Sequence, residues 1–355
     1  MPTLLLDKEK CLANMERMAG KARGSGLGFR PHFKTHQSAE IGSWFRDFGV
    51  ERITVSSFRM AAYFSRAGWK DILVAFPFHP GEKDALREMS RTANMSILLD
   101  DTWALPALKG LDYPVEFYVD VDTGYGRSGI PALDPERTAE LIRQSENTRN
   151  LKFKGFYCHA GHSYKAASRN EMEDIHHTSM RDLQRLKDLF RRFQPMVLYG
   201  DTPNCSLQVD FGPVDELTPG NFVFYDLTQV DLGSCDDDQI AVAMSCPVSG
   251  RYPGNKLLVH GGAVHFSKEV LEWQGMKAYG QVAEAREKGW GQPRDIFLTG
   301  LSQEHGTIEN CGALWDQVRP GDELLILPVH SCLTANLMGS YRTLGGETIT
   351  TLHAC

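Results

Sequence analysis

One short stretch near the N-terminus groups side chains that could do covalent chemistry. RPHFKTHQS, residues 30–38, sets Lys34 between His32 and His36 at two-residue spacing. In an extended strand these three side chains would share one face. An ammonium crowded by histidines and removed from water has a lowered pKa and becomes a nucleophile, so the pattern predicts a Schiff-base lysine. A lysine that extends its charged end out of an apolar rim fits the same position.

A second stretch, PVHSC near the C-terminus, combines two metal-binding residue types. His330 and Cys332 follow the apolar run DELLILP, and in a continued strand they would share a face. An imidazole and a thiolate suit a soft or borderline metal, above all zinc. Two protein ligands leave the remaining positions to water or substrate, as a catalytic metal requires. H-x-C alone does not define a metal site, and Mn²⁺ or Mg²⁺ is the alternative ion.

Further polar segments lie where apolar runs end. Arg127, in the glycine-rich turn DTGYGRSG, could pair its guanidinium with a carboxylate or a phenolate, although a surface turn has the same composition. His159 and His162, in CHAGHSY, are candidate acid/base groups or hydrogen-bonded core histidines. YGDTPNCS and TPGNFVFYD suit a phosphate held by backbone amides and hydroxyls, but ordinary turns use the same residues, and Asp201 fits poorly beside a phosphate.

The elements that must position these residues follow from the alternation of strand-like and helix-like runs. Eight units of this kind predict a closed (β/α)₈ barrel with its site at the carboxyl ends of the strands. After residue 239 the texture changes to short β-rich runs broken by Gly and Pro, which predicts an antiparallel β domain. We therefore expect an α/β chain with a barrel at 10–238 and a β domain at 239–355. The predicted strands begin near Leu27, Arg52, Asp71, Met95, Val115, Leu151, Met196 and Phe222.

A helix is expected directly after the lysine motif. Ser38 is a good N-cap, and Ile41, Trp44, Phe45 and Phe48 recur at helical spacing. This places Lys34 between the end of a strand and the start of a helix.

Composition narrows the class of partner. The chain has 355 residues and a formal charge of −7 with no basic run, which argues against nucleic acid and anionic membranes and favours a small-molecule substrate. No apolar run reaches the length of a secretory signal or a membrane span, so a cytoplasmic protein is expected. The eight cysteines are scattered, and most are expected to be reduced and buried.

Taken in order, the motifs RPHFKTH, DTGYGRSG, GHSY, GDTP, PGNFVFYD, SQEHG and PVHSC resemble the D-threonine aldolase and D-serine dehydratase family. These are metal-activated pyridoxal-phosphate enzymes of the alanine-racemase-like fold, fold type III. The resemblance implies a homodimer and a β domain that also takes in residues 1–9. It makes Lys34 the Schiff-base lysine that also moves the α-proton, and His330 and Cys332 the metal ligands. It sets Arg127 near the phenolic oxygen of the cofactor, and its phosphate-side positions are Thr202, Gly220, Asn221 and Tyr225.

The same resemblance suggests a reaction. Family members ending in H-x-C resemble D-serine dehydratases and those with H-x-D resemble D-threonine aldolases, so Cys332 favours dehydration of a β-hydroxy-D-amino acid to a 2-oxo acid and ammonia. Retro-aldol cleavage, with His159 or His162 as base, and racemisation remain open, and a non-catalytic cofactor carrier would lack the β domain. Gln37, GDTPN, Val329 and HGGAVHFSK depart from the family pattern and leave the substrate open.

Overall fold

The computed structural model describes residues 1–273 and 275–353. Contacts divide the chain into two compact units. The barrel unit comprises Arg17–Lys34 and Gly42–Gly220, and the β unit comprises Met1–Glu16, Thr35–Ile41 and Asn221–Cys355. The domain boundary at residue 238 is predicted from the change to short β-rich runs in the sequence, and it stays a prediction.

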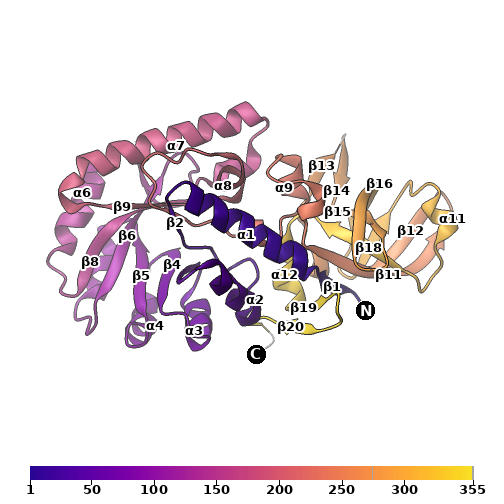
Figure 1. Cartoon of the computed structure of the whole chain (residues 1–355), viewed down its shortest axis with the longest axis horizontal. Helices are drawn as coiled ribbons and strands as arrows, with labels where there is room; N and C mark the ends of the chain where they lie inside the picture. The colour runs from indigo at the N-terminus through magenta and orange to yellow at the C-terminus, as the bar shows by residue number, and fades with distance from the viewer. Residues whose placement is uncertain (274, 354–355) are drawn as a thin grey trace. The chain divides into compact units, whose positions relative to one another are not determined.

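The barrel unit holds a parallel sheet of eight strands, in agreement with the predicted fold class (Figure 1). The strand order is β2-β10-β9-β8-β6-β5-β4-β3, and a parallel bridge between His32 and Thr54 joins its two ends. A short ninth strand, β7 (Ile130–Pro131), pairs with β6. The eight strands are β2 (Gly28–Phe29), β3 (Arg52–Val55), β4 (Asp71–Pro77), β5 (Asn94–Leu99), β6 (Val115–Asp122), β8 (Leu151–Cys158), β9 (Met196–Tyr199) and β10 (Glu216–Leu217).

Helices follow most of these strands and lie on the outside of the barrel (Figure 1). Several begin at a Ser or Asp whose side chain accepts a backbone N–H, as Ser57, Asp134 and Ser168 do. The helices of this part of the chain are α1 (Lys8–Gly24), α2 (Ala39–Trp44), α3 (Phe58–Arg66), α4 (Lys83–Met89), α5 (Leu105–Leu108), α6 (Pro135–Ser145), α7 (Arg169–Leu189) and α8 (Thr202–Leu207). Single 3₁₀ turns lie between them: η1 (Phe45–Phe48), η2 (Pro80–Glu82), η3 (Thr102–Ala104), η4 (Gly161–Lys165) and η5 (Arg191–Phe193).

The inside of the barrel is filled by side chains rather than open. A cluster of buried residues from five strands packs there: Leu73, Leu98, Tyr118, Tyr157 and Leu198. At the amino ends of the strands the buried guanidinium of Arg30 pairs with Asp71 at 2.7 Å and Glu216 at 2.8 Å. The chemistry is therefore left to the carboxyl ends of the strands, as the barrel architecture predicts.

Two local predictions were wrong. No strand forms at Phe222, because Asn221–Val223 is a 3₁₀ turn, η6, and the eighth strand is the two-residue β10. Residues 33–36 form a turn rather than an extended strand, so Lys34 does not share a strand face with the two histidines. The helix after Ser38 is confirmed: α2 is followed by η1, and Ile41 N–H donates to Ser38 Oγ at 3.5 Å.

The β unit is built on a nine-stranded sheet that is antiparallel except where β1 meets β19, in agreement with the predicted β domain. β1 (Thr3–Leu6) pairs with β11 and β19, and the predicted bounds 1–9 of this contribution stay a prediction. The other strands are β11 (Val242–Tyr252), β12 (Lys256–His260), β15 (Gly280–Ala285), β16 (Trp290–Leu301), β17 (His305–Ile308), β18 (Glu323–Pro328), β19 (Ser340–Thr343) and β20 (Thr348–Thr350). A separate hairpin joins β13 (Leu271–Trp273) to β14 (Met276–Ala278).

Short helices connect the strands of the β unit. They are α9 (Leu227–Asp231), η7 (Asp237–Gln239), α10 (Ala263–Phe266), α11 (Leu314–Gln317) and α12 (Ser331–Met338). Neither these nor the helices of the barrel unit, in the described part of the chain, combine the length and apolar character needed to cross a bilayer.

Candidate active site

Lys34 lies at the carboxyl end of β2, in the turn that follows the strand. Its backbone N–H donates to Nδ1 of His32 at 3.3 Å, which tightens the turn. The side chain is exposed, so the predicted removal of its ammonium from water is not seen. His36 is fully buried, and burial lowers its pKa to about 3. An exposed lysine at the mouth of a filled barrel is accessible to a small aldehyde.

His159, directly after β8, lies on the same rim as Lys34. Its Nδ1 is 2.6 Å from the carbonyl oxygen of Gly200, so this nitrogen carries the proton and donates it. Burial, followed by the charges of Lys34 and Arg127, lowers the pKa of His159 to about 3. His159 is therefore a neutral imidazole whose Nε2 is available as an acceptor.

His162 belongs to η4, the turn that follows His159. Its ring stacks on Tyr125 with centroids 6.2 Å apart, and burial lowers its pKa. Gly161, between the two histidines, allows this packing because a Cβ at that position would lie 2.4 Å from the Tyr125 ring. Among the described residues Nδ1 of His162 is buried without a hydrogen-bond partner.

Arg127 is exposed in the turn after β6, with its guanidinium 5.1 Å from the centroid of the Tyr125 ring. Backbone N–H groups of Gly124 and Gly126 donate to the carboxylate of Asp122, at 2.9 and 3.1 Å to Oδ1, and this shapes the turn. The turn thus presents a cation beside an aromatic ring at the barrel mouth.

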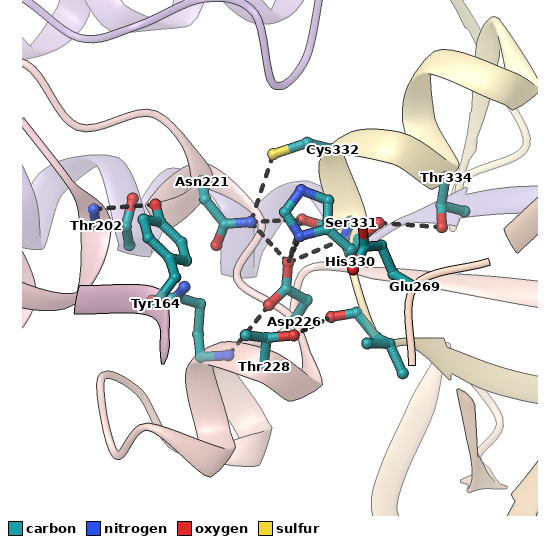
Figure 2. Close-up of polar contacts among 12 residues, drawn as sticks. Tyr164, Thr202, Asn221, Asp226, Thr228, Glu269, His330, Ser331, Cys332 and Thr334 are labelled. Carbon is teal, nitrogen blue, oxygen red and sulfur yellow. Dashed lines mark hydrogen bonds and ion pairs between the residues drawn. The ribbon is translucent and has the colours of Figure 1, made fainter. Parts of the chain in front are cut away.

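The segment after β9 supplies the phosphate-side candidate Thr202. Its backbone N–H donates to the hydroxyl of Tyr164 at 3.2 Å (Figure 2). Asp201, which fits poorly beside a phosphate, is buried and turned inward: it accepts from Ser163 Oγ at 3.0 Å and from the backbone and side-chain nitrogens of Asn204. Burial raises the pKa of Asp201 to about 6. Its charge is therefore engaged by donors within the barrel unit.

The remaining phosphate-side candidates follow β10. Gly220 ends the barrel unit, and Tyr225 has a left-handed backbone with φ of 50°. The side-chain nitrogen of Asn221 donates to Asp226 at 2.6 Å and Ser331 Oγ at 3.1 Å, and lies 3.5 Å from Cys332 Sγ. The Asn221 side chain is thus committed to the surroundings of Cys332, which leaves its backbone for a phosphate, and that role stays a prediction.

The metal candidates meet at the junction of β18 and α12 rather than along one strand face. His330 is the extended N-cap residue of α12, and Cys332 lies in the first turn of the helix. In the β unit the Cys332 sulfur also lies 3.2 Å from Thr35 Oγ1 (Figure 2 shows His330 and Cys332). The predicted pairing of His330 and Cys332 thus arises from a strand-to-helix turn.

The two candidate ligands perturb each other. Burial is the largest single influence and opposes a thiolate at Cys332, but the hydrogen bond and charge of His330 together with the hydrogen bond of Thr35 lower the pKa of Cys332. Burial likewise disfavours an imidazolium, yet the hydrogen bond and charge of Cys332 raise the pKa of His330 to about 9. By contrast, burial raises the pKa of Cys11, Cys158 and Cys205. The shift at Cys332 is opposite in direction and favours the thiolate, the form of cysteine that binds metals.

Sequence reasoning missed Asp226, which is fully buried beside His330. Its Oδ2 accepts from Ser331 N–H at 2.9 Å and Ser331 Oγ at 3.1 Å, and lies 4.0 Å from His330 Nδ1. Asp226 ends the motif PGNFVFYD and caps α9 by accepting the backbone N–H of Gln229. An Asp directly before a helical run was therefore the sequence signal that could have drawn attention to it.

A second group of possible metal ligands, His260, His265 and Glu304, has a different character. The carboxylate of Glu304 lies 3.6 Å from His260 Nε2 and 4.0 Å from His265 Nε2. However, Nδ1 of His265 accepts the backbone N–H of Gly262 at 3.1 Å. The neutral ring therefore carries its proton on Nε2, where it faces Glu304 and offers no lone pair to a metal. We therefore interpret the cluster as the Glu304 carboxylate interacting with two histidine rings, and not as a metal site.

Comparisons with known proteins bear on the whole chain. Alanine racemase, N-terminal domain, matches residues 6–225, and Putative serine dehydratase domain matches residues 241–344. This chain belongs to the alanine racemase-like family that includes D-serine dehydratases and D-threonine aldolases. The predicted family, fold and enzyme class, a lyase, are therefore confirmed.

Individual relatives are distant but nearly full length. D-serine dehydratase of Dictyostelium discoideum is 28% identical, with 94% of this chain and 90% of that protein covered. D-threo-3-hydroxyaspartate dehydratase of Delftia is 25% identical over 98% and 94% of the two chains. A variant of the Delftia enzyme, in which one cysteine is replaced by alanine, has been solved in the metal-free form. Its structure has a TM-score of 0.91 and 25% identity to this chain, with 99% of this chain and 97% of that chain covered. In another solved variant of that enzyme the histidine two residues earlier is replaced by alanine.

Family membership implies pyridoxal phosphate, and the side chains present fit it. Lys34 offers an accessible amine, Arg127 a cation, and Tyr164 and Thr202 polar groups on one rim, while the carboxylate of Asp201 accepts hydrogen bonds from inward donors. The donor set at His330 and Cys332, an imidazole and a thiol of lowered pKa, fits a borderline divalent metal.

Proposed function

We propose that this chain is a pyridoxal-phosphate- and zinc-dependent lyase that converts a β-hydroxy-D-amino acid to a 2-oxo acid and ammonia, as a D-serine dehydratase does. The observation that carries the proposal is the placement of His330 and Cys332 together at the start of α12, where the Cys332 sulfur contacts Thr35 and Asn221. It is supported by the relatives, of which several are dehydratases of D-serine or D-threo-3-hydroxyaspartate. The His-x-Cys spacing equals that of the two residues replaced in the Delftia variants.

Lys34 is the residue that we assign to cofactor attachment and to proton transfer. When bound, pyridoxal phosphate supplies an electron sink for negative charge at the substrate α-carbon. The Lys34 amine would then accept the α-proton at Nζ. Its exposure and its place at the carboxyl end of β2 support both tasks.

We assign the residues around Lys34 to hydrogen bonding and cofactor binding rather than to proton transfer. His159 is fixed by its hydrogen bond to the Gly200 carbonyl and stays neutral, so its Nε2 can accept a hydrogen bond without adding charge beside Lys34. Arg127 would face the phenolic oxygen of the cofactor, and Thr202 with Gly220, Asn221 and Tyr225 would hold its phosphate.

His330 and Cys332 are assigned to the metal. A divalent metal would supply a Lewis acid for the departing β-hydroxyl. The thiolate of Cys332 and one imidazole nitrogen of His330 would bind it, leaving other positions of its shell for water and substrate.

Retro-aldol cleavage is the second candidate, because 3-hydroxy-D-aspartate aldolase of Paracoccus denitrificans and D-threonine aldolase of Arthrobacter sp are also relatives. It needs a base for the β-hydroxyl proton. Burial lowers the pKa of His159 to about 3 and that of His162 below its ordinary value, so both are weaker bases than an ordinary histidine. This favours dehydration.

Product analysis separates these reactions. Protein loaded with pyridoxal phosphate and zinc should convert D-serine to pyruvate and D-threonine to 2-oxobutyrate, with equal ammonia and with no reaction of the L-isomers. A chelator should abolish turnover. Stoichiometric glycine and aldehyde would move the assignment to an aldolase, and loss of optical activity alone would move it to a racemase.

Two lysine variants test the site within the same assay. Lys34→Ala should lose at least about a hundredfold in turnover, since it removes the attachment point and the base. Lys165→Ala, which alters another exposed lysine of the barrel unit, is the matched control and should keep activity. Borohydride reduction of the loaded protein should label Lys34, and a label on any other lysine would refute the assignment.

The family resemblance also supports a homodimer, which the elution volume of the loaded protein would test. A cytoplasmic location likewise stays a prediction.

A further inference from the structure

The metal candidates are separated by a single residue, and that residue is held by a buried carboxylate. Asp226 Oδ2 accepts from the Ser331 backbone N–H at 2.9 Å and from its hydroxyl at 3.1 Å. Both bonds are buried, and Asp226 has no exposed side-chain surface. Because Ser331 stands between His330 and Cys332, fixing it fixes the backbone from which both ligands extend.

Asp226 also faces one of the ligands directly. Its Oδ2 lies 4.0 Å from Nδ1 of His330, an ion-pair distance longer than a hydrogen bond. Figure 2 shows the His330 ring between the carboxylate of Asp226 and the sulfur of Cys332. A carboxylate on this side favours a proton on Nδ1, which leaves the lone pair of the other ring nitrogen for a metal.

The other contacts of Asp226 extend the same arrangement. Asn221 Nδ2 donates to Oδ2 at 2.6 Å and also lies 3.5 Å from the Cys332 sulfur. The second oxygen, Oδ1, accepts the backbone N–H of Gln229 at 3.1 Å and so caps α9. One carboxylate therefore connects the start of α9, the start of α12 and both candidate ligands.

The charges point to a cation at this position. The side chain of Asp226 is fully buried and is joined to Cys332 through the side-chain nitrogen of Asn221, so an ionised carboxylate here lacks hydration. Thr35, Asn221 and Ser331 offer only neutral contacts there. A divalent cation on Cys332 and His330 would offset two negative groups at once.

We propose that Asp226 is a positioning residue for the metal: it orients His330 through Nδ1 and anchors both ligands through Ser331. This inference rests on the proposed function, because it needs a metal at His330 and Cys332. It assigns to the chain a carboxylate–histidine support that does not touch the metal.

The test measures zinc affinity rather than turnover. Full-length protein loaded with pyridoxal phosphate and stripped of metal is titrated with zinc against a coloured chelator. Asp226→Asn should weaken zinc binding by about 10- to 100-fold, the usual effect of losing such a partner. Asp231→Asn is the matched control, since it removes an exposed carboxylate at the other end of α9, and it should bind zinc as the wild type does.

A second variant separates orientation of the ligands from capping of the helix. Asp226→Ser keeps a residue able to cap α9 but has no carboxylate. We expect it to lose zinc affinity as Asp226→Asn does, while the metal-free protein keeps its thermal midpoint within a few degrees. With Co²⁺ in place of zinc, the thiolate-to-cobalt absorption band should persist in both variants and vanish in Cys332→Ala.

The outcomes distinguish this inference from the proposed function. Wild-type zinc affinity in Asp226→Ser would overturn the positioning role and leave the metal site intact. Absence of zinc binding by the wild type, or unchanged binding by Cys332→Ala, would overturn the metal site and this inference with it.

Discussion

At the residue scale, the barrel unit keeps two carboxyl groups near its mouth that are more readily protonated than usual. Asp120, on β6, accepts from Ser128 Oγ at 2.8 Å, and Asp201 accepts from Ser163 and Asn204. Burial is the main cause in both, and it raises the pKa of each to about 6. Their hydrogen bonds only partly offset the loss of hydration, so each destabilises the folded state when ionised.

Asp120→Asn should change the pH dependence of stability. The folded-state pKa of about 6 exceeds the ordinary value of 3.8, so the stabilisation from the protonated form is full below 3.8 and is lost as pH rises through 6. The variant should therefore be more stable than wild type at pH 7, by up to about 3 kcal/mol, with the difference vanishing near pH 4. Urea unfolding from pH 4 to 7.5 measures this.

The control removes one formal charge elsewhere. Asp112→Asn, at an exposed carboxylate, tests whether loss of a negative charge on the surface gives the same profile. A stability difference for Asp120→Asn that stays constant across this pH range would contradict the argument.

At the element scale, the position of His159 depends on a close approach between two strands. Gly155 of β8 pairs with Met196 of β9, and a Cβ at Gly155 would lie 1.9 Å from the Met196 carbonyl oxygen. Backbone cannot yield as a flexible side chain does. His159 follows β8 and Gly200 follows β9. The close contact of the two strands therefore sets the distance between His159 and Gly200, which a hydrogen bond joins.

Gly155→Ala should force β8 and β9 apart. We expect a loss of about 3 kcal/mol or more, at the upper end of the usual cost of overpacking, seen as a lower urea midpoint. Gly24→Ala is the matched control, because no atom outside its chain neighbours and its own helix turn lies within 4 Å of the corresponding Cβ, and at this helical position it should not lower stability. Equal effects of the two substitutions would show that the β8–β9 approach does not limit packing.

At the scale of the whole molecule, zinc would act on folding as well as on catalysis. His330, Cys332 and Asp226 all belong to the β unit, together with β1 from the chain's first residues. A metal that binds only the folded chain stabilises it in proportion to the logarithm of its concentration. Metal content and stability should therefore change together.

Zinc should raise the thermal midpoint of the wild type and not that of Cys332→Ala. At a hundred times Kd the stabilisation is about 2.7 kcal/mol, which calorimetry of the metal-stripped protein with and without added zinc would detect. Cys235→Ala removes another cysteine side chain of the β unit and should keep the full response. An equal zinc response in Cys332→Ala would place the stabilising metal elsewhere.

The sequence alone predicted the barrel, the family and the pairing of the two candidate metal ligands. Alternating strand-like and helix-like runs predicted the barrel, because each β/α unit carries its own hydrophobic period, and the order of short motifs predicted the family. His330 and Cys332 could be paired because they are two residues apart. What the tertiary structure decided involves short or distant segments: the two-residue β10 is too short to show a period, and residues 33–36 turn where alternation suggested a strand. Asp226 meets Ser331 across 105 positions of sequence, and Arg30 meets Glu216 across 186, because the packing of separate elements chooses the partner of a buried charge.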